Sequence, residues 1–439
     1  GASMTERTAG FDRSTALAVV VANMIGTGVF TSLGFQLLDI QSGFAILLLW
    51  TLGGIAALCG ALCYGELGAA LPRSGGEYNF VGQIYHPGAG FISGWISATV
   101  GFAAPVALVA MTFAAYLNAA IPGIPPKPVA IALILLLAIV HSRSHEASGN
   151  VQWWATAVKL ALIAAFCAAT LVLVDTPQPI SFLPAAGDQT AVLSGAFAVA
   201  LIYVNYAYTG WNAATYLIGE LRQPQRDLPV VLFVGTGLVA VVYLCLNAAF
   251  LYAAPVDAMA GKIEIGYIAA EYIFGDVGAR LMAVILAALL ISTVSAMTLA
   301  GPRVLQMLGQ DYAALRMLAR ENDNGIPAVA VYAQSVLAVL LVITSTFESI
   351  LVFTGFILGL NTLLTVLGVV RLRMTQPELA RPFTVPWYPL PVVVYSAITL
   401  WTLVHIMLNK PTEALVALGI ILAGLVFYLA TPRKHSTPA

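Results

Sequence analysis

Apolar segments about twenty residues long recur along the whole chain of 439 residues. The chain is 60% hydrophobic and only 9% charged, whereas a soluble protein carries about 25% charged residues because its surface faces water. A helix of roughly twenty apolar residues crosses the hydrocarbon of a bilayer. We therefore expect an all-α protein embedded in a lipid bilayer. The net charge of −1 does not indicate a nucleic-acid partner.

The apolar segments predict twelve membrane-spanning helices. Their expected ranges are 15–38, 44–70, 90–119, 128–141, 150–174, 192–220, 229–253, 278–302, 327–345, 349–371, 387–408 and 413–430. Between these spans, residues 255–275 are expected to form an amphipathic helix on the outer face. Residues 303–325 are expected to be helical until the sequence ENDNG ends the helix.

Lysine and arginine set the expected orientation. With a cytoplasmic N-terminus, fourteen of these nineteen residues lie inside, four lie outside, and Lys159 lies within a span. Both termini are therefore predicted to be cytoplasmic. Residues 1–14 are the expected N-terminal tail, whose first three residues are read as a tag-cleavage scar, and residues 431–439 are the C-terminal tail.

The chain shows no pattern typical of a metal, disulfide or nucleotide site. The four cysteines lie in apolar segments and are expected to be small buried thiols rather than a disulfide framework; they are Cys59, Cys63, Cys167 and Cys245. His141 and His145 have a spacing suited to a metal, but further ligands are missing, so solvated histidines are predicted. No Walker motif indicates ATP as an energy source. We expect no cofactor.

The first span contains the stretch NMIGTGVF, which places Gly26, Thr27 and Gly28 near its middle. Each glycine costs a helix about 1 kcal/mol relative to alanine. In lipid, a helix unwinds only where protein or a water-filled cavity satisfies the freed backbone groups. The stretch therefore predicts either a polar cavity or a close helix crossing.

A second interruption is predicted in the sixth span, where Thr209 and Asn212 flank Gly210. Interruptions in corresponding positions of two five-helix halves indicate an inverted-repeat transporter. The halves would be residues 15–174 and 192–371, followed by two further helices in 387–430. A half-helix starting at Thr27 offers N–H groups to a carboxylate, and half-helices ending near Met24 and Tyr208 offer carbonyls to an ammonium group. An α-amino acid carries both groups.

Five motifs resemble the amino acid–polyamine–organocation (APC) superfamily. They are IGTGVF, YGELGAALPRSGGEYNFV (64–81), AYTGWNAATYLIGELRQPQRDLP (207–229), SAMTLAGPRVLQML and RPFTVPWYPLP (381–391). The AYTGWN element is most similar to the L-type amino acid transporter branch. The resemblance implies a LeuT-type 5+5 inverted repeat with discontinuous helices 1 and 6, plus two C-terminal helices.

The resemblance also implies a substrate site at the two interruptions. The substrate carboxylate would meet Gly26, Thr27 and Gly28, and the amino group would meet carbonyls of Met24, Tyr206 and Thr209, with Asn212 beside them. Tyr206 stands where an aromatic residue usually forms an outer gate. Thr209 replaces the glycine or aspartate common in this branch, and its β-branch is expected to narrow the side-chain pocket.

Charged residues in the spans provide further candidates. Lys159 is read either as a snorkelling side chain or as a functional cation. The resemblance favours a cation in place of sodium, near Ser292 and Ser295. Glu66, Glu220 and Arg303 are interpreted either as inner-gate ion pairs or as ordinary charges at helix ends.

The sequence thus predicts a sodium-independent secondary transporter of neutral L-amino acids that works by alternating access, with exchange as the first hypothesis. Proton-coupled symport through Lys159, or transport of a related amine or polyamine, is the alternative. A channel, an enzyme or a sensor fits less well, because filter motifs, catalytic clusters and signalling domains are missing. Residues 120–128 lack the cysteine that links animal relatives to a heavy chain, so we expect no disulfide-linked partner. A bacterial inner membrane is the expected location.

Overall fold

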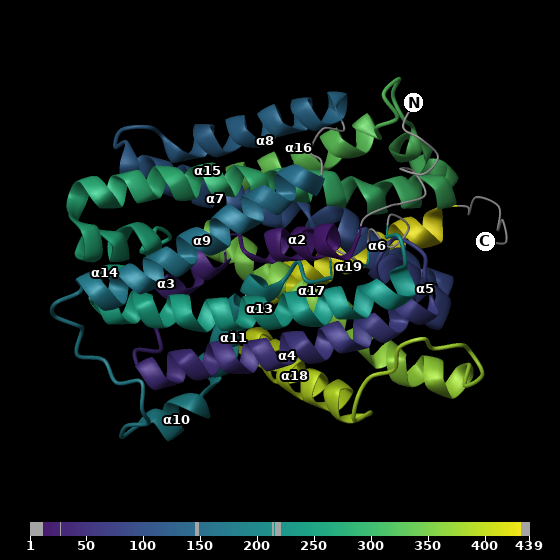
Figure 1. The fold of residues 1–439 in the computed structure, drawn as a ribbon. Coiled ribbons are helices and arrows are strands. Elements are labelled where there is room, and N and C mark those ends of the chain that lie inside the picture. Colours follow the sequence, from purple (N-terminus) through teal and green to yellow (C-terminus); the bar gives the residue numbers. More distant parts are fainter. Residues whose placement is uncertain (1–11, 27, 145–148, 213–214, 216–220, 432–439) are drawn as a thin grey trace.

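The computed structural model describes residues 12–26, 28–144, 149–212, 215 and 221–431. Over these residues the regular structure is helical, without β-strands (Figure 1). Nine helical segments of this described part are long and apolar enough to cross a membrane. They are α4 (Gly43–Ala70), α6 and α7 together (Pro87–Ala120), α8 (Pro126–Arg143), α9 (Gly149–Leu173), α13 (Pro224–Ala253), α15 (Ile265–Asp311), α17 (Phe347–Thr375), α18 (Leu390–Asn409) and α19 (Pro411–Ala430).

Three shorter apolar helices complete the set of long elements: α2 (Arg13–Met24), α11 (Gly195–Tyr208) and α16 (Ala328–Thr344). The shorter elements are η1 (Gly28–Phe30), α3 (Ser32–Gln36), α5 (Glu77–Ile84), η2 (Ser97–Gly101), α10 (Asp188–Val192), α14 (Val256–Met259) and η4 (Ala313–Ala319). Each predicted span overlaps one of the long apolar segments. The prediction of an all-α membrane protein is confirmed.

Capping residues explain where several helices begin. The side chains of Asp12, Ser42 and Ser194 accept hydrogen bonds from backbone N–H groups in the first turns of α2, α4 and α11. Proline occupies the first turn of α8 at Pro126 and of α19 at Pro411, where the missing N–H costs no helical hydrogen bond. These local signals favour the observed helix starts.

Both predicted interruptions are present. Helix α2 ends at Met24, Ile25 has a non-helical ψ of 81°, and the chain resumes as the short helix η1. Helix α11 ends at Tyr208, and Thr209 is extended, with φ −61° and ψ 154°. Gly210 follows with a φ of 102°, a conformation that glycine adopts without a steric penalty.

The predicted outer helix 255–275 is wrong, and two other segments need description. Residues 255–275 are not one helix, because α14 ends at Met259 and α15 starts at Ile265. Helix α15 then bends at Gly275, whose φ of 82° is non-helical, and continues through the eighth span to Asp311. The helical structure predicted for 303–325 is confirmed: α15 and the 3₁₀ helix η4 cover it up to Ala319, and the helix ends just before the sequence ENDNG. The third predicted span contains the π-helical turn η2 between α6 and α7.

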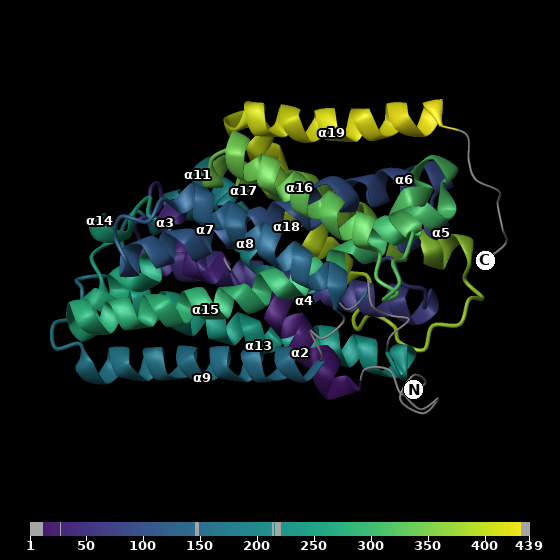
Figure 2. The ribbon, with the colours of Figure 1, turned by 90° about the horizontal axis from the view of Figure 1, so that it is seen from above.

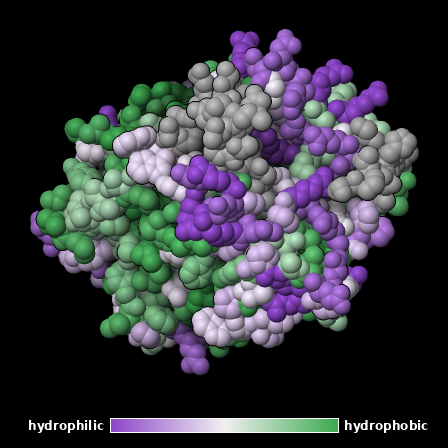
Figure 3. Space-filling model, turned by 45° about the vertical axis from the view of Figure 1, so that its right-hand side comes forward, coloured by the Kyte–Doolittle hydropathy of each residue, from purple (hydrophilic) through white to green (hydrophobic). Residues whose placement is uncertain are grey.

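The helices form a bundle in which most long axes run in similar directions (Figures 1 and 2). Helices α9 and α19 lie on opposite sides of it (Figure 2). Helix α2 packs against α9, α13 and α15, whereas α11 packs against α4, α17 and α18. Helix α5 lies at the right-hand end of the bundle in Figure 1. Hydrophilic residues gather toward that end, and hydrophobic residues cover the left of the view (Figure 3).

Candidate functional site

The first interruption is enclosed by neighbouring helices. Met24 is 2% exposed, and Gly26 and Gly28 are buried. A Cβ atom on Gly28 would lie 2.3 Å from the Cα of Ala207 in α11, and one on Gly26 would lie 2.6 Å from a methyl carbon of Thr293 in α15. Glycine is therefore required here by close approach of two helices. Thr27 lies outside the described residues.

A single tyrosine hydroxyl connects the two interruptions. Tyr243 of α13 is fully buried, and its hydroxyl lies 2.5 Å from the carbonyl oxygen of Met24 and 2.6 Å from that of Ala207. The two carbonyl oxygens share the single proton of this hydroxyl, and they belong to the end of α2 and the last turn of α11. Buried carbonyls that lose their helical partner need such a donor. The Met24 carbonyl is therefore already hydrogen-bonded within the protein.

The second interruption has its own internal hydrogen bonds. The backbone N–H of Thr209 donates to the carbonyl of Tyr206 at 3.0 Å, and the Thr209 hydroxyl donates to the same oxygen. The Tyr206 carbonyl, predicted to meet a substrate ammonium group, thus has two donors from Thr209. The side chain of Tyr206 is 4% exposed.

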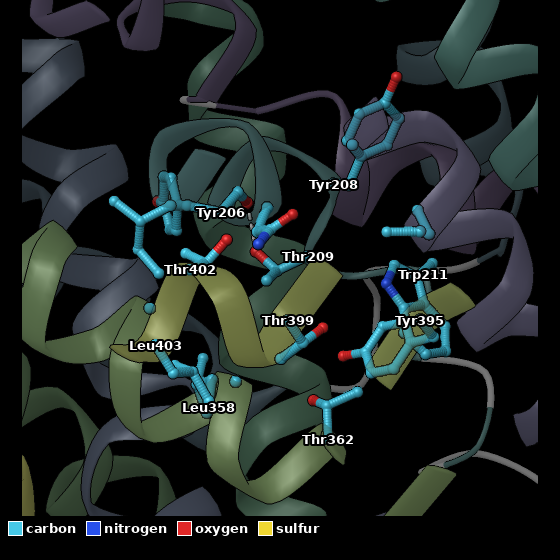
Figure 4. A pocket seen from close by; sticks show the side chains of 17 residues that line it. Tyr206, Tyr208, Thr209, Trp211, Leu358, Thr362, Tyr395, Thr399, Thr402 and Leu403 are labelled. Carbon is cyan, nitrogen blue, oxygen red and sulfur yellow. Dashed lines mark hydrogen bonds between the residues drawn. The ribbon is translucent and has the colours of Figure 1, made fainter. Parts of the chain in front are cut away.

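Two pockets adjoin this second interruption. The first pocket lies between α4, α11, α17 and α18 and has a cavity volume of about 60 Å³; Figure 4 shows its side chains. Tyr206 and Thr209 line it. The described residues that line this pocket are uncharged, and its hydroxyl groups come from Thr209, Thr362, Tyr395, Thr399 and Thr402 among others.

The second pocket lies on the other side of the interruption, between α5, η2, α7, α15 and α17, with a cavity volume of about 70 Å³. Asn212 and Glu77 contribute polar groups to it. Four residues line both pockets and form the wall between them: Thr209, Trp211, Leu358 and Thr362. Met24, Gly26 and Gly28 line neither pocket. Of the described substrate-site candidates, the structure therefore gathers Tyr206, Thr209 and Asn212 around open space.

Lys159 lies against the first interruption. Its side chain is 3% exposed, and its Nζ donates to the carbonyl of Ile25 at 3.2 Å and to the Thr293 hydroxyl at 2.6 Å. The amine thus joins α9 to the end of α2 and to α15. A carbonyl and a hydroxyl oxygen both solvate a positive charge, so this position suits a cation.

The predicted hydroxyl partners of Lys159 are wrong. Ser292 donates to the carbonyl of Leu289 in its own helix, and Ser295 bonds to the Nε2 of His141. The hydroxyl that faces the amine is Thr293. Because successive helical residues are rotated by about 100°, only one of these neighbours faces α9.

Two smaller predictions, on histidines and on cysteines, need correction. His141 is 4% exposed and bonded to Ser295, so it is not a solvated histidine. His145 lies outside the described residues. The four cysteines are free thiols, as expected, but only Cys63 is buried and Cys245 is exposed.

Glu66 belongs to a buried ion-pair cluster. Its side chain is fully buried and pairs with Arg373 at the end of α17 and, at 3.8 Å, with Arg381. The backbone N–H of Val385 donates to the same carboxylate at 3.0 Å. Glu66 therefore anchors the loop between α17 and α18, a role that the gating prediction did not include. Arg303 is half-buried in α15, and Glu220 lies outside the described residues.

Several residues of the site were missed in the sequence. Tyr243 and Thr293 sit in ordinary apolar spans, and nothing in their surroundings marks them out. Glu77 had a signal, because it is an acidic residue inside the conspicuous stretch YGELGAALPRSGGEYNFV of a chain with few charges. Trp211 belongs to the AYTGWN element but was not assigned a role.

A sequence profile of amino acid permeases matches residues 11–428. The chain belongs to the amino acid permease family. This permease is 28% identical over 425 residues to the b(0,+)-type amino acid transporter 1 of Mus musculus. The aligned region covers 94% of this chain and 85% of the relative. The permease is 29% identical over 433 residues to the Large neutral amino acids transporter small subunit 2 of the same species, with 96% and 80% covered. The resemblance to APC transporters is confirmed.

Proposed function

We propose that this permease is a sodium-independent secondary transporter of neutral L-amino acids that works as an exchanger by alternating access. The observation that carries the proposal is the position of Lys159. Its ammonium group lies on the Ile25 carbonyl and the Thr293 hydroxyl, beside the interruption of the first helix. A fixed cation at this position supplies the charge that a sodium ion would otherwise bring.

The pockets support a neutral substrate. The first pocket is lined by uncharged residues, with threonine and tyrosine hydroxyls set among apolar groups. Such a lining accepts a small apolar or hydroxylated side chain without leaving a charge unpaired. The names of the relatives, b(0,+)-type and large neutral amino acid transporters, agree with an amino acid as substrate.

Substrate contact at the first interruption requires a rearrangement. Met24, Gly26 and Gly28 are enclosed. The substrate carboxylate therefore reaches the Gly26, Thr27 and Gly28 backbone, and the amino group reaches the Met24 carbonyl, only when α11 or α13 moves away. Tyr206 acts as the outer gate. The inner gate, at the cytoplasmic end, is formed by the charged residues Glu66, Glu220 and Arg303. Alternating access supplies such a movement between the two repeats.

The proposal includes the architecture and the setting. Ten helices form two inverted repeats of the LeuT type, 15–174 and 192–371, and α18 and α19 bring the total to twelve. Both termini face the cytoplasm of a bacterial cell, and the carrier works without a disulfide-linked heavy chain, since residues 120–128 contain no cysteine.

A second candidate is proton-coupled symport. It is favoured by the same amine, because a fully enclosed lysine that exchanges a proton in each cycle would link uptake to a pH gradient. Under exchange, Lys159 keeps its proton and uptake is insensitive to external pH.

The experiment is uptake into proteoliposomes, screened across the amino acids with and without internal substrate and at several external pH values. Exchange predicts accumulation of label only in preloaded vesicles. Accumulation in unloaded vesicles that rises steeply at acid pH, and is lost in Lys159→Ala, would instead select symport. Absence of uptake for every neutral amino acid would contradict both.

A further inference from the structure

Glu77 is a buried acidic residue to which the proposed transport cycle assigns no role. It starts α5 but is only 2% exposed. Its Oε1 accepts a hydrogen bond from the Tyr64 hydroxyl of α4 at 2.8 Å and another from the Nδ2 of Asn212 at 2.6 Å. One carboxylate oxygen thus connects α4, α5 and the segment that follows the interruption of α11.

The hydrogen bond between Glu77 and Tyr64 also restrains Trp211, the residue before Asn212. The ring of Tyr64 packs edge-on against the ring of Trp211, with centroids 4.6 Å apart. Trp211 also lies against Gly60, where a Cβ atom would come within 3.0 Å of the indole. Because Glu77 fixes the Tyr64 hydroxyl, it holds Trp211 indirectly and Asn212 directly.

This restraint matters because the segment lacks helical hydrogen bonds. Residues 209–212 form turns after α11 ends, so contacts with other elements must fix their position. Hydrogen bonds to a carboxylate are stronger than those between neutral groups. A backbone bond adds to them, since the N–H of Gly76 donates to the carbonyl of Thr215 at 3.3 Å.

We propose that Glu77 is a positioning residue of the transport site, which holds Trp211 and Asn212 in place and thereby sets the affinity for substrate. Trp211 is part of the wall between the two pockets, and Asn212 lines the second. Displacement of either changes the shape of the space in which the substrate binds. The inference rests on the proposed function, in which these pockets hold an amino acid.

The test exchanges the two groups between their positions. Asn212→Asp sets a second carboxylate against Glu77, and we expect KM for uptake to rise about tenfold or more. Glu77→Gln alone has a smaller effect, because the glutamine oxygen still accepts from Tyr64 and the Asn212 amide can turn to accept from the new amide. The double variant restores one amide–carboxylate pair, so its KM should return to within about threefold of the wild-type value.

A control variant outside the pockets and two contrary outcomes make this proposal testable. Glu264→Gln, at the start of α15 and outside both pockets, should leave KM unchanged. Additive losses in the double variant, or reduced turnover with unchanged KM in all variants, would overturn the proposal. If Asn212→Asp does not fold, Tyr64→Phe replaces it: a rise of about threefold in KM supports the inference, and an unchanged KM overturns it.

A wild-type protein that takes up no amino acid would contradict the proposed function. It would not contradict the restraint of Asn212 by Glu77. Thermal unfolding without substrate then decides, measured on the wild type, Asn212→Asp, Glu77→Gln and the double variant. A melting temperature that is lowered by Asn212→Asp and recovered in the double variant supports the restraint. Lowering that simply adds in the double variant overturns it.

Discussion

The two interrupted helices differ in what surrounds the interruption. At the first, glycines allow α11 and α15 to approach the backbone so closely that no side chain fits between them. At the second, Thr209 and Trp211 border two pockets, and Gly210 supplies a positive φ. Glycine therefore has two uses here. It permits helix contact at one interruption and a turn beside open space at the other.

The largest expected effect comes from filling the closed interruption. Gly28→Val would drive its side chain into the backbone of α11 at Ala207, 2.3 Å from the new Cβ. We expect a loss of about 3 kcal/mol in stability, with little folded protein and no uptake. Gly419→Val in α19, where the added Cβ meets nothing within 4 Å, is the control. Wild-type melting temperature in Gly28→Val would show that the interruption is not closed by α11.

The next effect concerns the cation at the closed interruption. Lys159→Ala removes the only link described between α9 and the Ile25 carbonyl, and leaves the buried Thr293 hydroxyl without its partner. Uptake per folded protein should fall about tenfold or more, equivalent to roughly 1.4 kcal/mol. Lys127→Ala, an exposed lysine on α8, should keep normal uptake. Equal activity of both variants would remove Lys159 from the transport mechanism.

A smaller effect is expected from separating the two interruptions. Tyr243→Phe deletes the hydroxyl that reaches the Met24 and Ala207 carbonyls, which leaves two buried acceptors with one donor fewer. Stability should fall by about 2 kcal/mol, measured by thermal unfolding. Tyr272→Phe, at a residue 51% exposed, serves as the matched control. The bridge would be refuted by equal melting temperatures.

The smallest effect is expected at the open interruption. Thr209→Gly removes a β-branched side chain from the wall between the pockets, and glycine tolerates the extended backbone there. Uptake of large apolar amino acids relative to alanine should rise by about threefold, or roughly 0.6 kcal/mol. The ratio is measured by competition, with Thr209→Ser as the control. A ratio that falls or stays constant would mean that Thr209 does not limit side-chain size.

The sequence allowed prediction of the interruptions but not of what surrounds them. The glycines of the first and sixth spans stand beside polar residues in corresponding positions of the two halves, so both interruptions were expected. Whether the space around each is filled depends on side chains from distant helices, such as Ala207 against Gly28. The partner of Lys159 was misassigned because helix rotation selects Thr293 over its neighbours. The anchors of Glu66 lie about 300 positions away, at Arg373 and Arg381.

The most direct test of the central claim is the initial rate of amino acid exchange in proteoliposomes with sodium replaced by choline on both sides. Because the Lys159 ammonium group already lies on the Ile25 carbonyl and the Thr293 hydroxyl, we predict the same rate in sodium and in choline. A rate that requires sodium would contradict the account, since a cation site would then have to exist besides the one that the lysine fills.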